Sequence, residues 1–223
     1  MWSSSMLNDL QAIIFDMDGL IFDTEKYHRA CWQEAGKSFG YGIDDTFLKQ
    51  CASLTGQNTL RLLKDTFGEQ CPAEALHLHK RKLFNQKIGL ATIELKPGFA
   101  ELFSWLRAQP VKLGLVTSSR QQTVHHNFVG MDALDAFNTI VTGEQVTNSK
   151  PDPEPYSRAC RLLGVDPAKV MVFEDSNNGA LSAIRAGCKA VMVPDFSSPV
   201  EEVAEKAHAI IDSLEQARGL IDL

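Results

Sequence analysis

Two aspartates stand two residues apart where an apolar segment ends, in the stretch IIFDMDGLIFDTE from Ile13 to Glu25. The apolar residues 12–15 predict a buried strand, which Asp16 and Asp18 would follow directly. In a covalent phosphoryl transfer, one carboxylate attacks phosphorus, and a second protonates the leaving oxygen and then activates water. We therefore interpret Asp16, at the strand tip, as the nucleophile and Asp18, in the following loop, as the general acid and base.

Further polar residues follow the later apolar segments of the chain. Thr117, Ser118 and Ser119 follow VKLGLV at 111–116, Lys150 comes a little after NTIV at 138–141, and Glu174 and Asp175 follow KVMVF at 169–173. The carboxyl ends of parallel strands meet at one edge of a sheet, and ligands of open α/β sheets bind in the crevice beyond that edge. The sequence therefore predicts one polar site that is built from four chain segments.

The carboxylates of this site predict a magnesium ion. Carboxylates crowded together repel one another, and such sites bind a hard cation or raise a pKa. Magnesium accepts one or two carboxylates and keeps positions for water or a substrate phosphate. The expected metal residues are Asp16, Asp18, Glu174 and Asp175.

The same site offers contacts for a phosphate group. Lys150 and the hydroxyl of Thr117 would bind phosphate oxygens, while Gly19 permits a tight loop whose amides surround the group. Ser118 or Ser119 would replace Thr117 as the phosphate contact if the strand register differs by one residue. All four hydroxyl and ammonium groups therefore count as candidate site residues.

Alternating strands and helices after residue 95 must position these groups. The expected strands are the apolar segments 12–15, 111–116, 138–141, 169–173, 189–193 and 207–211. Continuous apolar strands that alternate with helices are typical of a parallel sheet covered on both faces. We therefore expect an α/β fold with a doubly wound parallel sheet.

The interval between the first strand and residue 95 shows helical periodicity instead. Apolar residues recur every three to four positions, for example at Leu60, Leu63 and Phe67. We expect a helical domain at 26–94, inserted into a core that consists of 1–25 and 95–223. Such an insertion would lie beside the predicted site.

Composition excludes several classes of protein. With 44% hydrophobic and 22% charged residues, the chain has no apolar run near the roughly 20 residues of a membrane span. A net charge of -6 argues against nucleic-acid binding, and we interpret the basic cluster HKRK at 79–82 as a solvated helix face. The start, MWSSSMLNDL, has no basic leader or apolar core, so we expect no secretory signal and a cytoplasmic protein. The five cysteines include no C-x-x-C pair, which favours reduced thiols.

The motifs FDMDG, Thr117, Lys150 in SKPDPEPY and VFEDS resemble, in order and spacing, the four signatures of the haloacid dehalogenase superfamily. The resemblance covers almost the whole chain and is to the branch with a helical cap between the first two motifs. It implies that Asp16 is the nucleophile, and that Asp18 is the acid and base and binds metal through its backbone carbonyl. Asp175 would bind metal directly, and Glu174 directly or through water. True dehalogenases of the superfamily lack the second aspartate and use no metal, so Asp18 indicates phosphoryl chemistry.

Within the superfamily, DTEKYHRACW at 23–32 is similar to the corresponding part of β-phosphoglucomutases. In those enzymes a histidine at the place of His28 helps to position the acid and base aspartate, and a lysine near the place of Lys82 binds sugar phosphate. The mutase cap loop also carries an arginine after a glycine, where this chain has LTGQNTLR with Arg61 two residues late. Candidate substrate contacts in the cap are therefore His28, Gln57, Asn58 and Lys82.

The sequence leaves three functions to consider. The first is a magnesium-dependent phosphatase of small phosphorylated metabolites, with sugar phosphates as the first choice. A β-phosphoglucomutase-like mutase is the alternative, which the missing cap arginine disfavours because a mutase must hold a bisphosphate. A non-catalytic, regulatory phosphate-binding protein is the third, which conflicts with the full set of catalytic groups. The family-wide expectation for the oligomeric state is a monomer.

Overall fold

The computed structural model describes residues 9–52, 54, 56–90 and 93–221. Residues 1–8, on which the expectation of no secretory signal mainly rested, lie outside this range. Among the described residues, no helix combines the length and the apolar character that crossing a bilayer requires. The cytoplasmic location stays a prediction.

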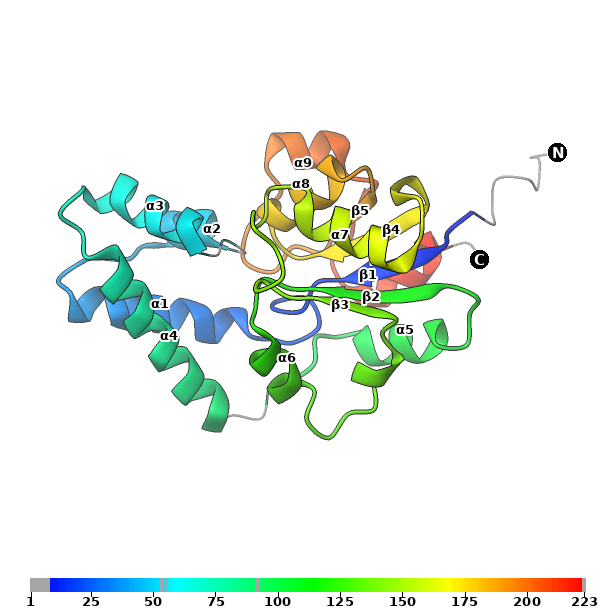
Figure 1. The fold of residues 1–223 in the computed structure, drawn as a ribbon, viewed down its shortest axis with the longest axis horizontal. Helices are drawn as coiled ribbons and strands as arrows, with labels where there is room; N and C mark the ends of the chain where they lie inside the picture. Colours follow the sequence, from blue (N-terminus) through cyan, green and yellow to red (C-terminus); the bar gives the residue numbers. More distant parts are fainter. Residues whose placement is uncertain (1–8, 53, 55, 91–92, 222–223) are drawn as a thin grey trace.

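Six parallel strands form one sheet in the order β3-β2-β1-β4-β5-β6 (Figure 1). The strands are β1 (Ala12–Phe15), β2 (Lys112–Val116), β3 (Thr139–Val141), β4 (Val170–Glu174), β5 (Lys189–Met192) and β6 (Ala209–Ile210). All six lie within one residue or two of the segments that the sequence predicted. The chain builds outward from β1 to β3 and then returns to place β4 on the other side of β1, which confirms the doubly wound α/β sheet.

Helices cover both faces of this sheet. The core helices are α5 (Phe99–Leu106), α6 (Gln121–Asn127), α7 (Glu154–Leu163), α8 (Asn177–Arg185) and α9 (Glu201–Lys206), with short 3₁₀ segments at Leu134–Ala136, Pro167–Lys169 and Leu214–Leu220. Along β1, Ile13 and Phe15 pack in the cluster that contains α5 and α6, whereas Ile14 packs in the cluster that contains α7 and α8. Burial on both faces explains why the strand is apolar at every position.

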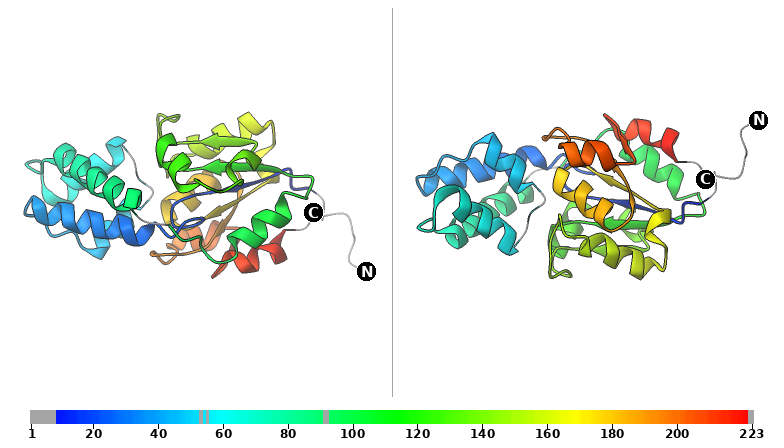
Figure 2. Two further views of the ribbon diagram at one scale, coloured as in Figure 1. Left: turned by 90° about the horizontal axis from the view of Figure 1, so that it is seen from below. Right: turned by 90° about the horizontal axis from the view of Figure 1, so that it is seen from above.

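A helical cap stands beyond the carboxyl end of β1 (Figures 1 and 2). It consists of α1 (Glu25–Ser38), α2 (Asp45–Cys51), α3 (Gly56–Phe67) and α4 (Ala73–Leu90), and it has its own apolar core around Trp32, Leu63 and Leu76. The two linkers to the core run antiparallel, because Asp23 N donates to Glu94 O at 2.9 Å and Lys96 N to Ile21 O at 2.8 Å. The exact domain boundaries at 26 and 94 stay a prediction.

Candidate active site

Three buried carboxylates meet one buried ammonium group at the ends of β1 and β4. Oxygens of Asp16, Glu174 and Asp175 lie within 4.8 Å of one another. Lys150, with a side chain that is 1% exposed, places Nζ 2.5 Å from Asp16 Oδ1 and 2.6 Å from Glu174 Oε1. One ammonium group cannot balance three carboxylates in a medium of low dielectric constant. The cluster therefore has an excess of negative charge.

Asp175 shows how a cation fits this cluster. Its Oδ1 is buried and has no hydrogen-bond partner among the described residues. Gly19, with a φ of 84°, makes room for this carboxylate, since a Cβ there would lie 2.2 Å from Asp175 Oδ2. Burial, and then the charges of Asp16 and Glu174, raise the pKa of Asp175. The unpartnered oxygen of Asp175, with carboxylates beside it, is therefore available as a ligand for a hard divalent cation.

Glu174 is held by several partners besides Lys150. Tyr156 donates from its hydroxyl to Glu174 Oε1 at 2.5 Å, and Ser176 Oγ lies 3.3 Å from Oε2. Gly179 permits this packing, because a Cβ there would lie 2.0 Å from the Glu174 carboxylate. Tyr156 ends the SKPDPEPY motif, but sequence reasoning did not assign it a role. Its buried hydroxyl fixes the carboxylate that in turn positions Lys150.

Asp18 lies apart from the cluster and accepts hydrogen bonds from hydroxyl groups. Its Oδ2 lies 2.7 Å from Ser119 Oγ and 3.3 Å from Thr117 Oγ1, and its Oδ1 lies 3.0 Å from Thr24 Oγ1. Burial raises the pKa of Asp18, but His28, Ser119 and Thr24 together lower it below the ordinary value. These groups favour the ionised form of Asp18, which suits a general base.

The three hydroxyl residues after β2 have different positions. Thr117 is buried, and its Oγ1 accepts from Ser119 N at 3.0 Å while it lies against Asp18. Ser118 and Ser119 line the cavity, whereas Thr117 is not among its lining residues. The role of Thr117 as a phosphate contact therefore stays a proposal, and the two serines remain alternatives.

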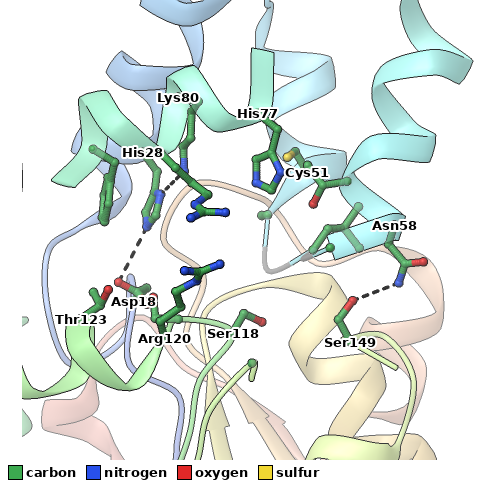
Figure 3. A pocket seen from close by; sticks show the side chains of 18 of the residues that line it. Asp18, His28, Cys51, Asn58, His77, Lys80, Ser118, Arg120, Thr123 and Ser149 are labelled. Atoms are coloured by element: carbon green, nitrogen blue, oxygen red, sulfur yellow. Dashed lines mark hydrogen bonds and ion pairs between the residues drawn. The ribbon is translucent and has the colours of Figure 1, made fainter. Parts of the chain in front are cut away.

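His28 links Asp18 to a buried lysine of the cap. Its Nε2 lies 3.8 Å from Asp18 Oδ1, and Lys80 Nζ donates to its Nδ1 at 2.7 Å (Figure 3). Because an ammonium group has no acceptor, Nδ1 must be the acceptor and the ring proton sits on Nε2, which faces Asp18. The ring also stacks on Phe84, with centroids 3.9 Å apart. His28 is therefore fixed in a position that supports Asp18.

Lys82 does not have the position that the sequence suggested. The structure places it on the exposed side of α4 and outside the cavity lining, whereas Lys80 is 7% exposed and Arg81 lines the cavity. Residues two apart on a helix point about 200° apart, so Lys80 and Lys82 cannot share a face. The interpretation of HKRK as a solvated helix face is therefore wrong for Lys80, because this side chain is buried.

We expect Lys80→Gln to lower kcat for phosphate release by about tenfold, because an uncharged partner orients His28 and Asp18 less firmly. The effect of this substitution on KM should be smaller, since Lys80 contacts His28 and would act on Asp18 through it. Lys82→Gln removes the same charge from the exposed face of the same helix and should leave both constants unchanged. Steady-state kinetics of the two variants measure this, and equal losses in both would contradict the role of Lys80.

A cavity of about 740 Å³ separates the cap from the core, and Asp16 and Asp18 are among its lining residues. Figure 3 shows His77 and Lys80 entering it from the cap and Ser118, Arg120 and Ser149 from the core. Gln57 and Asn58 line it as the sequence suggested, and Asn58 Nδ2 donates to Ser149 Oγ at 3.0 Å across the gap. Most of the predicted site residues therefore meet at one cavity.

Comparison with known proteins agrees with this architecture. The model of a family described as haloacid dehalogenase-like hydrolase matches residues 13–193. The chain belongs to this family. The match begins in β1 at Ile13 and includes the entire cap and all the predicted metal residues.

Relatives place the chain in the β-phosphoglucomutase-like branch of the haloacid dehalogenase family. The phosphorylated carbohydrates phosphatase of Thermotoga maritima is 27% identical over 96% of this chain and 91% of its own. The β-phosphoglucomutase of Bacillus subtilis is 27% identical over 82% of this chain and 83% of its own. A mutant of CbbY from Rhodobacter sphaeroides, solved with xylulose-(1,5)bisphosphate, is 28% identical with a TM-score of 0.80, over 96% of this chain and 100% of that one.

Proposed function

We propose that this hydrolase is a magnesium-dependent phosphatase that removes phosphate from small phosphorylated metabolites, with sugar phosphates as the preferred class. One observation carries the proposal: a buried cluster of three carboxylates and Lys150 reaches, through Asp16, a cavity that Asp18 also lines. Asp16 and Asp18 are then two carboxylates in different environments, one against an ammonium group and the other among hydroxyl groups. Different environments allow two acids to take different roles.

The first half of the proposed reaction forms a covalent intermediate. A carboxylate oxygen of Asp16 attacks phosphorus, and the bond from phosphorus to the ester oxygen breaks. Asp18, which takes up a proton from solvent before this step, gives it to the departing oxygen, which leaves as an alcohol. Lys150 holds Asp16 in place through its 2.5 Å contact and adds positive charge beside the phosphate oxygens.

The second half releases phosphate. Asp18, now ionised, takes a proton from water, and the water oxygen attacks the phosphorus of the aspartyl-phosphate. The bond between phosphorus and Asp16 breaks, which restores the carboxylate and frees inorganic phosphate. The hydroxyl groups around Asp18 stabilise its ionised form, which this step requires. His28 and Lys80 keep Asp18 oriented through both halves.

The metal residues proposed for this reaction are Asp16, Asp175, Glu174 and the backbone carbonyl of Asp18. A magnesium ion held by these residues would supply positive charge that offsets the negative charge of the transferred phosphoryl group. Asp175 is a candidate for direct coordination, because its buried Oδ1 has no hydrogen-bond partner among the described residues. The cap would exclude bulk water and select the substrate while the core does the chemistry.

Sugar phosphates are the proposed class because two similar proteins act on or bind phosphorylated sugars. One is a phosphatase of phosphorylated carbohydrates, and the CbbY mutant binds a sugar bisphosphate. The alternative is a mutase, which the relation to a β-phosphoglucomutase favours. Both share the first half-reaction and differ in whether water or a sugar hydroxyl accepts the phosphoryl group.

Phosphate release with magnesium and with EDTA tests the proposed function. The panel contains sugar phosphates, including both anomers of glucose 1-phosphate. We expect magnesium-dependent release of phosphate in step with substrate loss, and none with EDTA. Conversion of β-glucose 1-phosphate to glucose 6-phosphate in the presence of a bisphosphate, without free phosphate, would establish the mutase instead.

A further inference from the structure

Two thiol groups meet in the core, in the apolar cluster between the sheet and α7. Cys160 lies in α7 and Cys188 directly precedes β5, and their Sγ atoms are 3.7 Å apart in a hydrogen bond between the thiols. Both belong to the five free cysteines of the chain, and the other three, Cys31, Cys51 and Cys71, lie in the cap. The sequence predicts reduced thiols but does not show that two of them are in contact.

The backbone holds these two cysteines in place. Cys160 belongs to the last two turns of α7, whose buried face packs on the sheet. After α8 the chain turns at Gly187, which has a φ of 84°, and Cys188 N then donates to Ala183 O at 3.0 Å. Since hydrogen bonds fix the backbone on both sides, the folded protein keeps the two sulfurs close together.

The pair lies just below the surface of the core. Cys160 is 2% and Cys188 9% exposed, and the residue before Cys188 is the exposed Gly187. A hydrogen bond from Cys188 lowers the pKa of Cys160, whereas the same hydrogen bond, and then burial, raise the pKa of Cys188. Cys160 is therefore the thiol that ionises first, and the thiolate is the form of cysteine that reacts with oxidants.

We propose that Cys160 and Cys188 are a redox-active pair, which a peroxide converts into a disulfide that links α7 to the start of β5. The two Sγ atoms would have to approach by about 1.7 Å, because a disulfide bond is about 2.0 Å long. Rotation of both side chains about their Cα–Cβ bonds contributes to this approach without a change of fold. The inference concerns the core alone and does not depend on the proposed function.

The reaction consumes one molecule of hydrogen peroxide for each disulfide. The thiolate of Cys160 attacks one peroxide oxygen, the O–O bond breaks, and the departing hydroxide takes up the proton that Cys160 lost. The sulfur of Cys188 then attacks the sulfenic acid of Cys160, so that an S–S bond forms and the S–O bond breaks. The second oxygen leaves as water with the thiol proton of Cys188. Two thiols are thus oxidised to one disulfide, and the peroxide is reduced to two water molecules.

The disulfide would close a loop that carries part of the carboxylate cluster. Cys160 and Cys188 are 28 residues apart, and the segment between them contains β4 with Glu174, followed by Asp175. Tyr156, which donates to Glu174, lies one turn before Cys160 in α7. A cross-link of this kind stabilises a fold mainly because it restricts the unfolded chain. Oxidation should therefore make the core harder to unfold.

Peptide mapping after peroxide treatment tests the pair directly. The folded full-length protein is exposed to hydrogen peroxide, the peroxide is removed with catalase, and the remaining thiols are alkylated before digestion without reductant. We expect a disulfide-linked pair of peptides that contain Cys160 and Cys188, and we expect dithiothreitol to separate them. Alkylation of both cysteines, or their conversion to sulfinic or sulfonic acids without a link, would overturn the proposal.

Thermal unfolding shows whether the bond stabilises the core. The oxidised wild type should have a Tm about 5 to 10 °C higher than the reduced protein, and dithiothreitol should reverse this shift. Cys160→Ala and Cys188→Ala should each abolish the shift, whereas Cys71→Ala, which removes a buried thiol of the cap, should keep it. A wild-type Tm that peroxide does not raise, or a shift that persists in both core variants, would contradict the stabilising cross-link.

Discussion

Replacement of Asp16 by asparagine should lower the rate of phosphate release by at least about 10⁴-fold, because an amide cannot replace the carboxylate as nucleophile. Asparagine has nearly the shape of aspartate, so the packing at the end of β1 should persist. The variant removes one of three crowded carboxylates and leaves Lys150 in contact with Glu174. We therefore expect a Tm that is not lower than that of the wild type.

The measurement is single-turnover and steady-state phosphate release on freshly prepared protein, with mass spectrometry to verify that the asparagine is intact. In the wild type, rapid acid quenching should yield one phosphoryl group on the peptide that contains Asp16. Asp132→Asn is a matched control, because Asp132 pairs with Arg107 on the surface and its side chain is 83% exposed. Retention of more than about 1% of wild-type release by Asp16→Asn would exclude a nucleophilic role.

Replacement of Lys150 by methionine should have the largest effect on stability. Lys150 is the ammonium group that contacts both Asp16 and Glu174, and all three side chains are buried. Removing one partner of a buried ion pair typically costs about 3–5 kcal/mol, because the remaining charge has no compensation. Activity should be lost as well, since neither Asp16 nor a phosphate would have this positive charge beside it.

Thermal unfolding with and without magnesium measures this effect. If the carboxylate cluster binds the cation, magnesium should raise the Tm of Lys150→Met more than that of the wild type, because it restores positive charge to the cluster. Lys169→Met is the control, since it removes a partly exposed lysine that pairs with Asp9 on the surface and should not change the Tm measurably. A Lys150→Met protein as stable as the wild type would contradict the electrostatic account of the cluster.

The sheet and the residues at its carboxyl edge were predictable from the sequence. The apolar segment 12–15 is β1 itself. Asp16 and Asp18 follow β1, whereas Glu174 is the last residue of the neighbouring strand β4 and Asp175 follows it. Local signals suffice here, because strand length, apolar continuity and the rule that parallel strands end at one edge need no knowledge of distant contacts. Lys150 comes from a loop farther from its strand and was still identified, through its motif.

The side chains of the cap that face the cavity were only partly predictable from the sequence. Lys82 was one of four substrate contacts expected in the cap, but Lys80 and Arg81 line the cavity in its place. Tyr156 and Arg120 were not assigned roles. Successive residues of a helix point about 100° apart, so a shift of one or two positions changes the face on which a side chain lies. The sequence by itself determined the fold and the chemical groups at the strand ends. The tertiary structure decided which cap side chains face them, because that depends on how α4 is rotated and packed against α1 and over the core.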